Sequence, residues 1–226
     1  MKDIKVVFID ADDTLLDFKK CAKQSLRDGE QAFGLVLPEN TLSVFFKIND
    51  ELWRRLERGE LSFEKLHEIR WQLIFSELGV DFDAQKFESV FWKRLREIAV
   101  MMSGADELLE YLTKKYDVYV ASNAPIGQQE RKLTEIGLFP YIKDFFVSGK
   151  IGHAKPSKEF FDGCMEKLTG VEPAEIMMIG DSLTADVAGA KKYGMKTCWF
   201  NHRREYEPEG VADHVVYSLL EVKDIL

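Results

Sequence analysis

The chain has 226 residues, of which 46% are hydrophobic and 31% are charged, and its formal net charge is −8. This length suits one large domain, or a domain with an insert, and is enough to bury a core without a disulfide or a structural metal. The acidic balance argues against binding of nucleic-acid polymers, which needs a basic surface. It is compatible with a small anionic substrate, since one metal ion and one lysine can reverse the local charge of a pocket.

The cysteines and the apolar segments indicate the cellular compartment in which the protein acts. Cys21, Cys164 and Cys198 are scattered and lack CxxC spacing, which argues against a disulfide framework or a zinc site and favours reduced thiols. The first residues lack the long apolar region of a signal peptide, and no apolar run approaches the roughly 20 residues of a transmembrane helix. We therefore expect a cytoplasmic protein without membrane contact, present as a monomer or a homodimer.

Six short apolar runs, rich in β-branched and aromatic residues, predict the strands of a parallel sheet. They lie at residues 5–9, 118–121, 145–147, 176–179, 197–200 and 214–216. Helical patterns follow the second, third and fourth runs, at residues 127–137, 156–168 and 184–193. Strands that alternate with helices predict an α/β fold whose sheet is covered on both faces, with right-handed crossovers.

The region between the first two strands has no convincing strand of its own. Apolar and aromatic side chains recur there at helical spacing, over residues 42–56 and 63–74, and most of them should pack helix on helix. We therefore predict an all-helical domain, residues 18–100, inserted into a core made of residues 1–17 and 101–226.

An acidic turn, DADDT, follows the first predicted strand directly. Its Asp10 lies beyond the carboxyl end of that strand, where ligands bind in open α/β sheets. Asp12 is near enough for both carboxylates to face one reacting centre, and such a pair attracts a cation or a proton. In phosphoryl transfer one carboxylate can attack phosphorus while the other moves a proton, and Thr14 would hold the turn through its hydroxyl. By itself, the motif is explained equally well as an acidic turn or a helix cap.

A second acidic motif, GDSLTAD at residues 180–186, follows the fourth predicted strand. Asp181 lies at the tip of that strand, so Asp10 and Asp181 could supply the carboxylate oxygens that Mg²⁺ prefers. Asp186 could orient a metal-bound water or Lys155 without binding the metal itself. Capping of the next helix accounts for part of this motif, but it does not explain a carboxylate at position 181.

Three more polar residues lie near two other strand ends. A residue before proline is extended, and proline favours the first helical position, so Lys155 should lie just before a helix. From there its ammonium could balance the charge of Asp10 and hold a phosphate oxygen. Ser122 and Asn123 follow the second strand, where a hydroxyl and backbone N–H groups can bind phosphate oxygens. Each alone could be an exposed lysine or a plain turn. Their coincidence with the acidic motifs at strand ends predicts a single site.

Together these motifs resemble those of the haloacid dehalogenase (HAD) superfamily. The turn at residues 10–14 is similar to its first motif, Ser122 to the second, Lys155 to the third and residues 180–186 to the fourth. The resemblance implies a Rossmann-like parallel-sheet core, and it identifies the helical insert as a C1-type cap domain that moves over the site.

The resemblance also implies a reaction, which is the Mg²⁺-dependent hydrolysis of phosphate monoesters. Asp10 would be the nucleophile and Asp12 the general acid and base. The metal would be bound by the Asp10 carboxylate, the Asp12 backbone carbonyl and Asp181. Dehalogenases of the family lack an aspartate at the position of Asp12, so its presence favours phosphoryl chemistry.

A finer resemblance points to a branch that hydrolyses pyrimidine nucleoside 5′-monophosphates. It is carried by DDTLLDF after the first strand, by INDELWRRLERGELS in the helical insert and by TCWFN near the C-terminus. The chain departs from that branch at Ala124, where glycine is common, so the shape of this loop is in doubt. From residue type and location alone, Trp53 could stack on a base and Arg70 could reach the phosphate or the ribose.

Three other functions stay open at this point. The same core could serve a phosphatase for a sugar or another small phosphate ester, since the insert decides specificity. Dehalogenation is disfavoured by Asp12. A non-catalytic binding protein on the same scaffold would be expected to lack one of the acidic motif residues, and none is missing.

Overall fold

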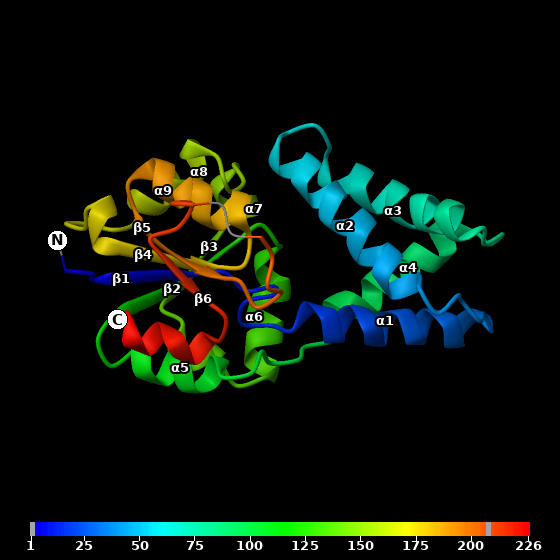
Figure 1. Ribbon diagram of the computed structural model, residues 1–226, viewed down its shortest axis with the longest axis horizontal. Helices are drawn as coiled ribbons and strands as arrows, with labels where there is room; N and C mark the ends of the chain where they lie inside the picture. The colour runs from blue at the N-terminus through cyan, green and yellow to red at the C-terminus, as the bar shows by residue number, and fades with distance from the viewer. Residues whose placement is uncertain (1–2, 207–208) are drawn as a thin grey trace. The chain divides into compact units, whose positions relative to one another are not determined.

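The computed structural model describes residues 3–206 and 209–226 and divides the chain into two units. One unit combines Met1–Phe18 with Ala99–Leu226, and the other is Lys19–Ile98 (Figure 1). The breaks lie after residues 18 and 98, where we predicted them after residues 17 and 100. Among the described residues, no helix has both the length and the apolar character needed to cross a bilayer.

The first unit is built on a parallel sheet whose strand order is β3-β2-β1-β4-β5-β6. All six predicted strands are present in the described part of the chain, at β1 Val6–Ile9, β2 Asp117–Ser122, β3 Asp144–Val147, β4 Ile176–Gly180, β5 Lys196–Phe200 and β6 His214–Val216. The order reverses between β1 and β4, and ligands bind in α/β sheets beyond the carboxyl ends of strands at such a reversal.

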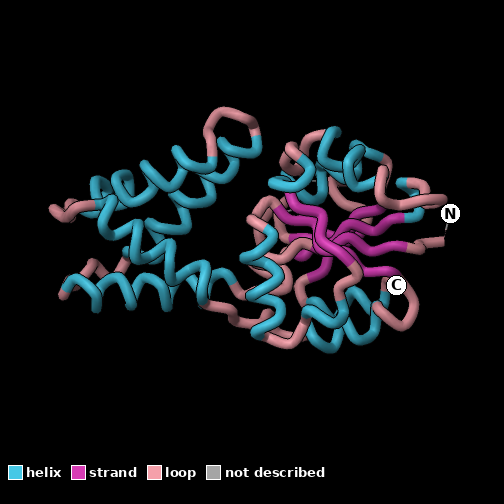
Figure 2. The backbone as a smooth tube through the Cα atoms, turned by 180° about the vertical axis from the view of Figure 1, so that it is seen from behind, coloured by secondary structure: helices cyan, strands magenta, loops and turns pink. Residues whose placement is uncertain are grey.

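Helices cover both faces of the sheet, as the alternating side chains of β1 require (Figure 2). Val7 and Ile9 pack with α5 (Ala105–Leu112), α6 (Ile126–Glu135) and the 3₁₀-helix η4 (Leu219–Asp224). Val6 and Phe8 belong to the opposite cluster, with α8 (Lys158–Met165) and α9 (Gly189–Tyr193). The short helices of this unit are η1 Phe139–Tyr141, α7 Ser148–Ile151 and η2 Pro173–Glu175.

Two helices of this unit differ from the prediction by more than one residue at the start, or in helix type. Helix α8 begins at Lys158 rather than at Pro156, because the Ser157 hydroxyl accepts a hydrogen bond from the Phe160 N–H and so caps the helix at that point. The helix expected over residues 184–193 consists of a π-helical stretch, η3 (Leu183–Ala188), which continues into α9. Wide turns of this kind occur frequently at functional sites.

The second unit is all-helical in its described residues, as predicted. Its helices are α1 Phe18–Phe33, α2 Thr41–Glu57, α3 Phe63–Leu78 and α4 Ala84–Glu97. Aromatic rings form its core: the Trp71 ring centroid lies 4.3 Å from that of Phe87, 5.0 Å from Phe91 and 5.2 Å from Phe75. The aromatic residues of this region therefore pack mainly on one another.

Arg70 lies inside this helical unit, which disagrees with its predicted role as a substrate contact. Its side chain is 1% exposed. Its guanidinium donates to both carboxylate oxygens of Glu88, at 2.6 and 3.2 Å, and to the Asn49 side chain at 3.1 Å. These partners hold the cation within the helix bundle, so its role is to join α3 to α4 and α2. Trp53 is half-buried with its ring edge-on to Phe63, and its predicted contact with a base stays a prediction.

Candidate active site

The turn after β1 is organised around one carbonyl oxygen. The N–H groups of Thr14, Leu15 and Leu16 all donate to the Ala11 oxygen, at 3.3, 2.9 and 2.8 Å. Asp13 adopts a left-handed conformation with φ of 65°, which aspartate tolerates better than most residues. This compact turn lets Asp10 and Asp12 project from neighbouring positions at the end of the strand.

Asp13 is held by residues that follow β5, far away in the sequence. Its Oδ2 accepts hydrogen bonds from Arg203, through Nε at 2.9 Å and through Nη2, and lies 3.4 Å from His202 Nε2. Burial by itself would raise the pKa of Asp13, but the hydrogen bonds and charges of His202 and Arg203 lower it below its ordinary value. Sequence reasoning missed this ion pair, because no local pattern joins positions 13 and 203.

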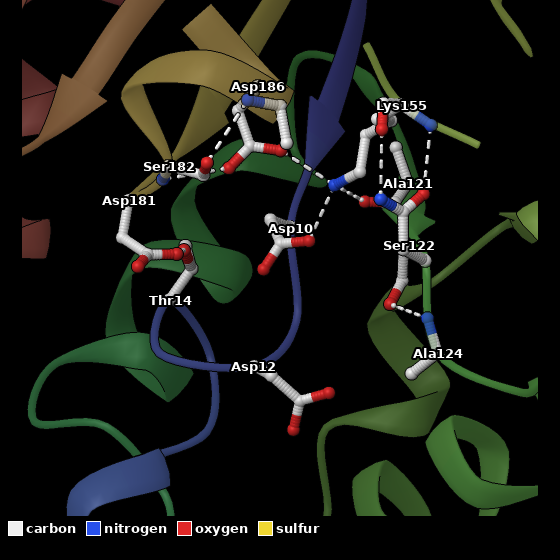
Figure 3. A network of polar contacts seen from close by, with 12 residues as sticks. Asp10, Asp12, Thr14, Ala121, Ser122, Ala124, Lys155, Asp181, Ser182 and Asp186 are labelled. Carbon is white, nitrogen blue, oxygen red and sulfur yellow. Dashed lines mark hydrogen bonds and ion pairs between the residues drawn. The ribbon is translucent and has the colours of Figure 1, made fainter. Parts of the chain in front are cut away.

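Lys155 lies at the centre of the site and bridges two carboxylates (Figure 3). Its Nζ donates to Asp10 Oδ1 and to Asp186 Oδ1, both at 2.6 Å, and to the Ala121 carbonyl oxygen at 2.5 Å. The side chain is only 2% exposed. Burial alone would lower the pKa of Lys155, but Asp10 and Asp186 raise it above its ordinary value, so the ammonium stays charged. This arrangement agrees with the prediction that Lys155 balances Asp10.

The side chain of Asn123 holds the backbone of Lys155. Its Nδ2 donates to the Lys155 carbonyl oxygen at 3.0 Å, and its Oδ1 accepts from the Lys155 N–H at 2.9 Å. Both ends of the amide are therefore used within the protein. The side chain therefore fixes the loop from which Lys155 projects, and the phosphate contact predicted for this segment, through backbone N–H groups, stays a prediction.

Asp181 and Asp186 take different positions beyond β4. Asp181 accepts a hydrogen bond from the Thr14 hydroxyl at 3.3 Å, so Thr14 links the turn after β1 to this carboxylate. Asp186 is 1% exposed and uses both oxygens, one for Lys155 and one for the Ser182 N–H at 3.0 Å. Gly180 makes room for it, because a Cβ there would overlap the Asp186 carboxyl group. Asp186 thus contacts Lys155, one of the two partners that we proposed for it, and the contact with a metal-bound water stays a prediction.

The carboxylates of the site are suited to a divalent cation. Oxygens of Asp10, Asp181 and Asp186 lie within 4.8 Å of one another, and Lys155 contacts two of the three groups. One ammonium cannot balance three carboxylates, and hard carboxylate oxygens are the ligands that Mg²⁺ prefers. Because Asp186 is committed to Lys155 and Ser182, Asp10 and Asp181 are the side chains best placed to hold the ion.

The raised pKa of Asp10 also indicates that the site is suited to a divalent cation. Burial raises its pKa to about 8, against the opposing charge of Lys155 and with a further contribution from Asp186. Burial, together with the charges of Asp13 and Asp10, also raises the pKa of Asp181 well above its ordinary value. A protonated Asp10 is a poor nucleophile, and a bound cation would favour its ionised form. The residues present therefore fit a metal ion.

Asp12 is held from helix α6 by two residues that sequence reasoning did not identify. Gln129 Nε2 donates to Asp12 Oδ2 at 2.5 Å, and Lys132 Nζ lies 3.4 Å from Asp12 Oδ1. The side chain of Asp12 keeps 28% of its surface exposed. The sequence does show a glutamine and a lysine three residues apart, on a predicted helix that follows a motif strand. Their burial, which marks them as site residues, cannot be predicted from a single sequence.

Ser122 is arranged as a hydrogen-bond donor toward the site. Its Oγ accepts from the Ala124 N–H at 3.1 Å and from Gln129 Nε2 at 3.3 Å, which occupies both lone pairs. No acceptor for its hydroxyl hydrogen is found among the described residues, so that hydrogen can serve a phosphate oxygen. Ala124 does not have a positive φ, so the loop conformation needs no glycine at this position.

The structure therefore brings most of the predicted site together at one edge of the sheet. The residues that meet there are Asp10, Asp12, Thr14, Ser122, Lys155, Asp181 and Asp186. In Figure 3, Asp10 lies between Lys155 on one side and Asp181 with Thr14 on the other. A nucleophilic carboxylate, a second carboxylate, a fixed ammonium and a hydroxyl donor can together attack, protonate and hold a phosphate ester.

Several known proteins are similar to this chain over nearly its whole length. A family model of haloacid dehalogenase-like hydrolases matches residues 4–194. The HAD-hydrolase YfnB of Bacillus subtilis is 31% identical over 100% of this chain and 97% of its own length. The pyrimidine 5′-nucleotidase PynA of Streptococcus pneumoniae is 30% identical over 98% of this chain and 94% of that protein. The pyrimidine 5′-nucleotidase YjjG of Escherichia coli is 26% identical, over 97% and 96%.

A solved structure agrees with the sequence comparison. The crystal structure of YfnB bound to magnesium matches with a TM-score of 0.91, at 31% identity, and the match covers 100% of this chain and 99% of that one. The parallel sheet, the inserted helical unit and the family model, which spans most of the chain, lead to the same conclusion. This chain belongs to the haloacid dehalogenase-like hydrolases.

Proposed function

We propose that this protein is a Mg²⁺-dependent phosphatase that hydrolyses phosphate monoesters through an aspartyl-phosphate on Asp10, and that its substrates are pyrimidine nucleoside 5′-monophosphates. The observation that carries the phosphatase assignment is the second carboxylate, Asp12, which helix α6 holds next to the nucleophile. A leaving alkoxide needs a proton, whereas a leaving halide does not, so a held carboxylate at this position favours phosphate esters over haloacids.

The reaction uses the protein groups in two steps. A carboxylate oxygen of Asp10 attacks phosphorus, the bond from phosphorus to the ester oxygen breaks, and Asp12 gives its proton to the leaving alkoxide. Water then attacks the phosphorus of the aspartyl-phosphate, Asp12 takes a proton from it, and the bond to Asp10 breaks to release inorganic phosphate. Ser122 would hold a phosphoryl oxygen throughout, and the Lys155 ammonium, whose three hydrogens are shared among Asp10, Asp186 and the Ala121 carbonyl, would supply positive charge beside the nucleophile.

The metal would be held by Asp10, by Asp181 and by the backbone carbonyl of Asp12. When bound, it supplies positive charge that lowers the cost of bringing an anionic ester to an anionic nucleophile. Each oxygen of Asp186 already accepts a hydrogen bond, one from Lys155 and one from the Ser182 N–H, and these contacts keep Lys155 directed at Asp10. Removal of the ion should therefore abolish turnover while the Lys155 contacts stay in place.

The nucleotide part of the proposal rests on the relatives. PynA and YjjG are pyrimidine 5′-nucleotidases, and each match covers more than nine-tenths of this chain. Cys21, Cys164 and Cys198 are buried, and no disulfide joins them in the described part of the chain, which supports our expectation that the protein acts in the reducing cytoplasm. Trp53 of α2 is half-buried, and we keep it as a candidate for stacking on the base.

A panel of phosphate esters tests the proposal. It should include UMP, dTMP, purine nucleotides, sugar phosphates and a 2-haloacid, each with Mg²⁺ and with EDTA. We expect phosphate release that needs Mg²⁺, with the highest kcat/KM for UMP or dTMP. A higher value for a sugar phosphate would replace the substrate class and keep the chemistry, and halide release without phosphatase activity would overturn both.

Two variants test the assignment of the nucleophile. Asp10→Asn should abolish turnover, because a neutral amide cannot form the acyl-phosphate. The matched control is Asp117→Asn at the start of β2, where the side chain is exposed and pairs with Lys143. Normal turnover by Asp10→Asn would show that another group attacks phosphorus.

A further inference from the structure

Helix α6 carries two polar side chains that are buried toward the site. Gln129 and Lys132 are three residues apart, which places them on the same side of a helix. They are 0% and 1% exposed. Each contacts a different oxygen of Asp12: Gln129 donates to Oδ2 at 2.5 Å, and the Lys132 ammonium lies 3.4 Å from Oδ1. The carboxyl group of Asp12 is thus held at both ends by one helix.

Gln129 also connects Asp12 to Ser122. The two hydrogens of its amide nitrogen are shared between Asp12 Oδ2 and Ser122 Oγ, the latter at 3.3 Å. Because the Ser122 oxygen accepts a second hydrogen bond from the Ala124 N–H, its own hydrogen is turned away from these donors. One side chain therefore sets the direction of both a carboxyl group and a hydroxyl group.

Fold stability does not explain why these residues are polar. Taking an ammonium out of water is costly, and the structure shows one ion-pair partner for Lys132 among the described residues, the partly exposed Asp12. The Oε1 atom of Gln129 is buried and has no hydrogen-bond partner among the described residues. An unpaired buried acceptor also lowers the free energy of unfolding. Apolar side chains of similar size would fill the same space without these costs. Polar groups that are retained against stability point to a role in the reaction.

We propose that Gln129 and Lys132 are positioning residues that hold the carboxyl group of Asp12 where it can pass a proton to the leaving alkoxide, and that Gln129 also aims the Ser122 hydroxyl at the phosphoryl group. The inference rests on the proposed phosphatase function. Neither residue touches the reacting atoms, and each acts through the side chain that it binds. Lys132 acts on Asp12 alone, whereas Gln129 acts on Asp12 and Ser122, so their variants should differ in a defined way.

The first test uses the leaving group. Nucleoside phosphates release an alkoxide that needs a proton, whereas p-nitrophenyl phosphate releases a phenolate that leaves without one. With enzyme in excess and Mg²⁺ present, rapid quenching measures release of the alcohol and so isolates the first step. We expect Lys132→Met to slow alcohol release from the best alkyl phosphate of the panel by roughly tenfold, which is less than the effect of losing the acid–base group altogether. Release of p-nitrophenol from p-nitrophenyl phosphate should change by less than about twofold. KM should stay within about twofold of that of the unaltered protein.

The second test asks whether Lys132 acts through Asp12. In a double-mutant cycle, Lys132→Met should cause no further loss when Asp12 is already Asn, because the carboxylate that it positions is gone. Gln129→Leu should slow the first step in the same way and also raise KM, since it releases Ser122. Lys132→Arg should recover part of the rate. Arg131→Met is the control, because this neighbouring basic side chain faces solvent and pairs with Glu135.

The outcomes separate this inference from the function on which it rests. If no phosphate ester is turned over by the unaltered protein, the proposed function fails first. If the protein is an active phosphatase but Lys132→Met slows both classes of ester equally, or slows the Asp12→Asn variant by the same factor, the positioning role is wrong. A lowered melting temperature of Lys132→Met with an unchanged leaving-group profile would show that the residue is structural.

Discussion

Gly180 provides a sharp test of the packing behind Lys155. A Cβ added at this position would overlap the carboxyl carbon and Oδ2 of Asp186 and would lie 2.8 Å from the Asp186 Cβ, closer than real Cβ atoms approach one another. In Gly180→Ala the Asp186 side chain must therefore move out. Lys155 then loses a carboxylate at 2.6 Å, and the Ser182 N–H loses its acceptor at 3.0 Å.

The expected cost follows from these contacts. Removing one partner of a buried ion pair costs about 3–5 kcal/mol, and because Lys155 keeps Asp10 we expect the lower end, about 3 kcal/mol. For a chain of this size each kcal/mol lowers the melting temperature by roughly 2–4 °C, so the shift should be about 6–12 °C. Displacing the catalytic ammonium by an ångström should also lower kcat by roughly tenfold to a hundredfold.

Thermal unfolding and steady-state kinetics check both parts of this prediction. Gly149→Ala is the control, because Gly149 is exposed and no atom lies within 4 Å of a Cβ built there. Its melting temperature should stay within about 2 °C of that of the unaltered protein. A Gly180→Ala protein that melts and turns over like the control would refute the idea that the empty space at Gly180 holds Asp186 in place.

The other predictions concern pH and two ion pairs. In EDTA the free energy of unfolding should fall by at least about 1.4 kcal/mol per pH unit as pH rises from about 4 to about 8, because folded Asp10 keeps a proton that the unfolded chain has already released, and Asp181, whose pKa is also raised, acts in the same direction. Excess Mg²⁺ should flatten this slope in urea titrations, and a flat slope in EDTA would contradict the raised pKa. Arg70→Ala should lower the stability of the helical unit by about 3–5 kcal/mol, because it leaves Glu88 buried without its cation, and hydrogen exchange of α3 and α4 would show it. Unchanged exchange would mean that the ion pair contributes little. Arg203→Ala should cost about 1–3 kcal/mol by leaving buried Asp13 with one partner fewer, and an unchanged melting temperature would count against that.

Much of the fold could be predicted from the sequence because its signals are local. A buried parallel strand is a short apolar run, and all six runs became strands with ends that differ from the prediction by one residue at most. The acidic residues after β1 and β4 were recognisable for the same reason. Parallel strands bring their carboxyl ends to one edge, so residues at positions 10 and 181 had to meet once the sheet formed.

The roles of single side chains were decided by contacts between distant segments. Arg70 looked like a substrate contact until α4 supplied Glu88 as its partner, and the Asn123 amide holds the backbone of Lys155, a residue far away in the sequence. Gln129 and Lys132 could not be singled out from the sequence, because residue type and helical spacing do not say which face of a helix is buried. Strand identity depends on a few neighbouring residues, whereas hydrogen-bond partners depend on which segments the folded chain brings within about 3 Å of each other.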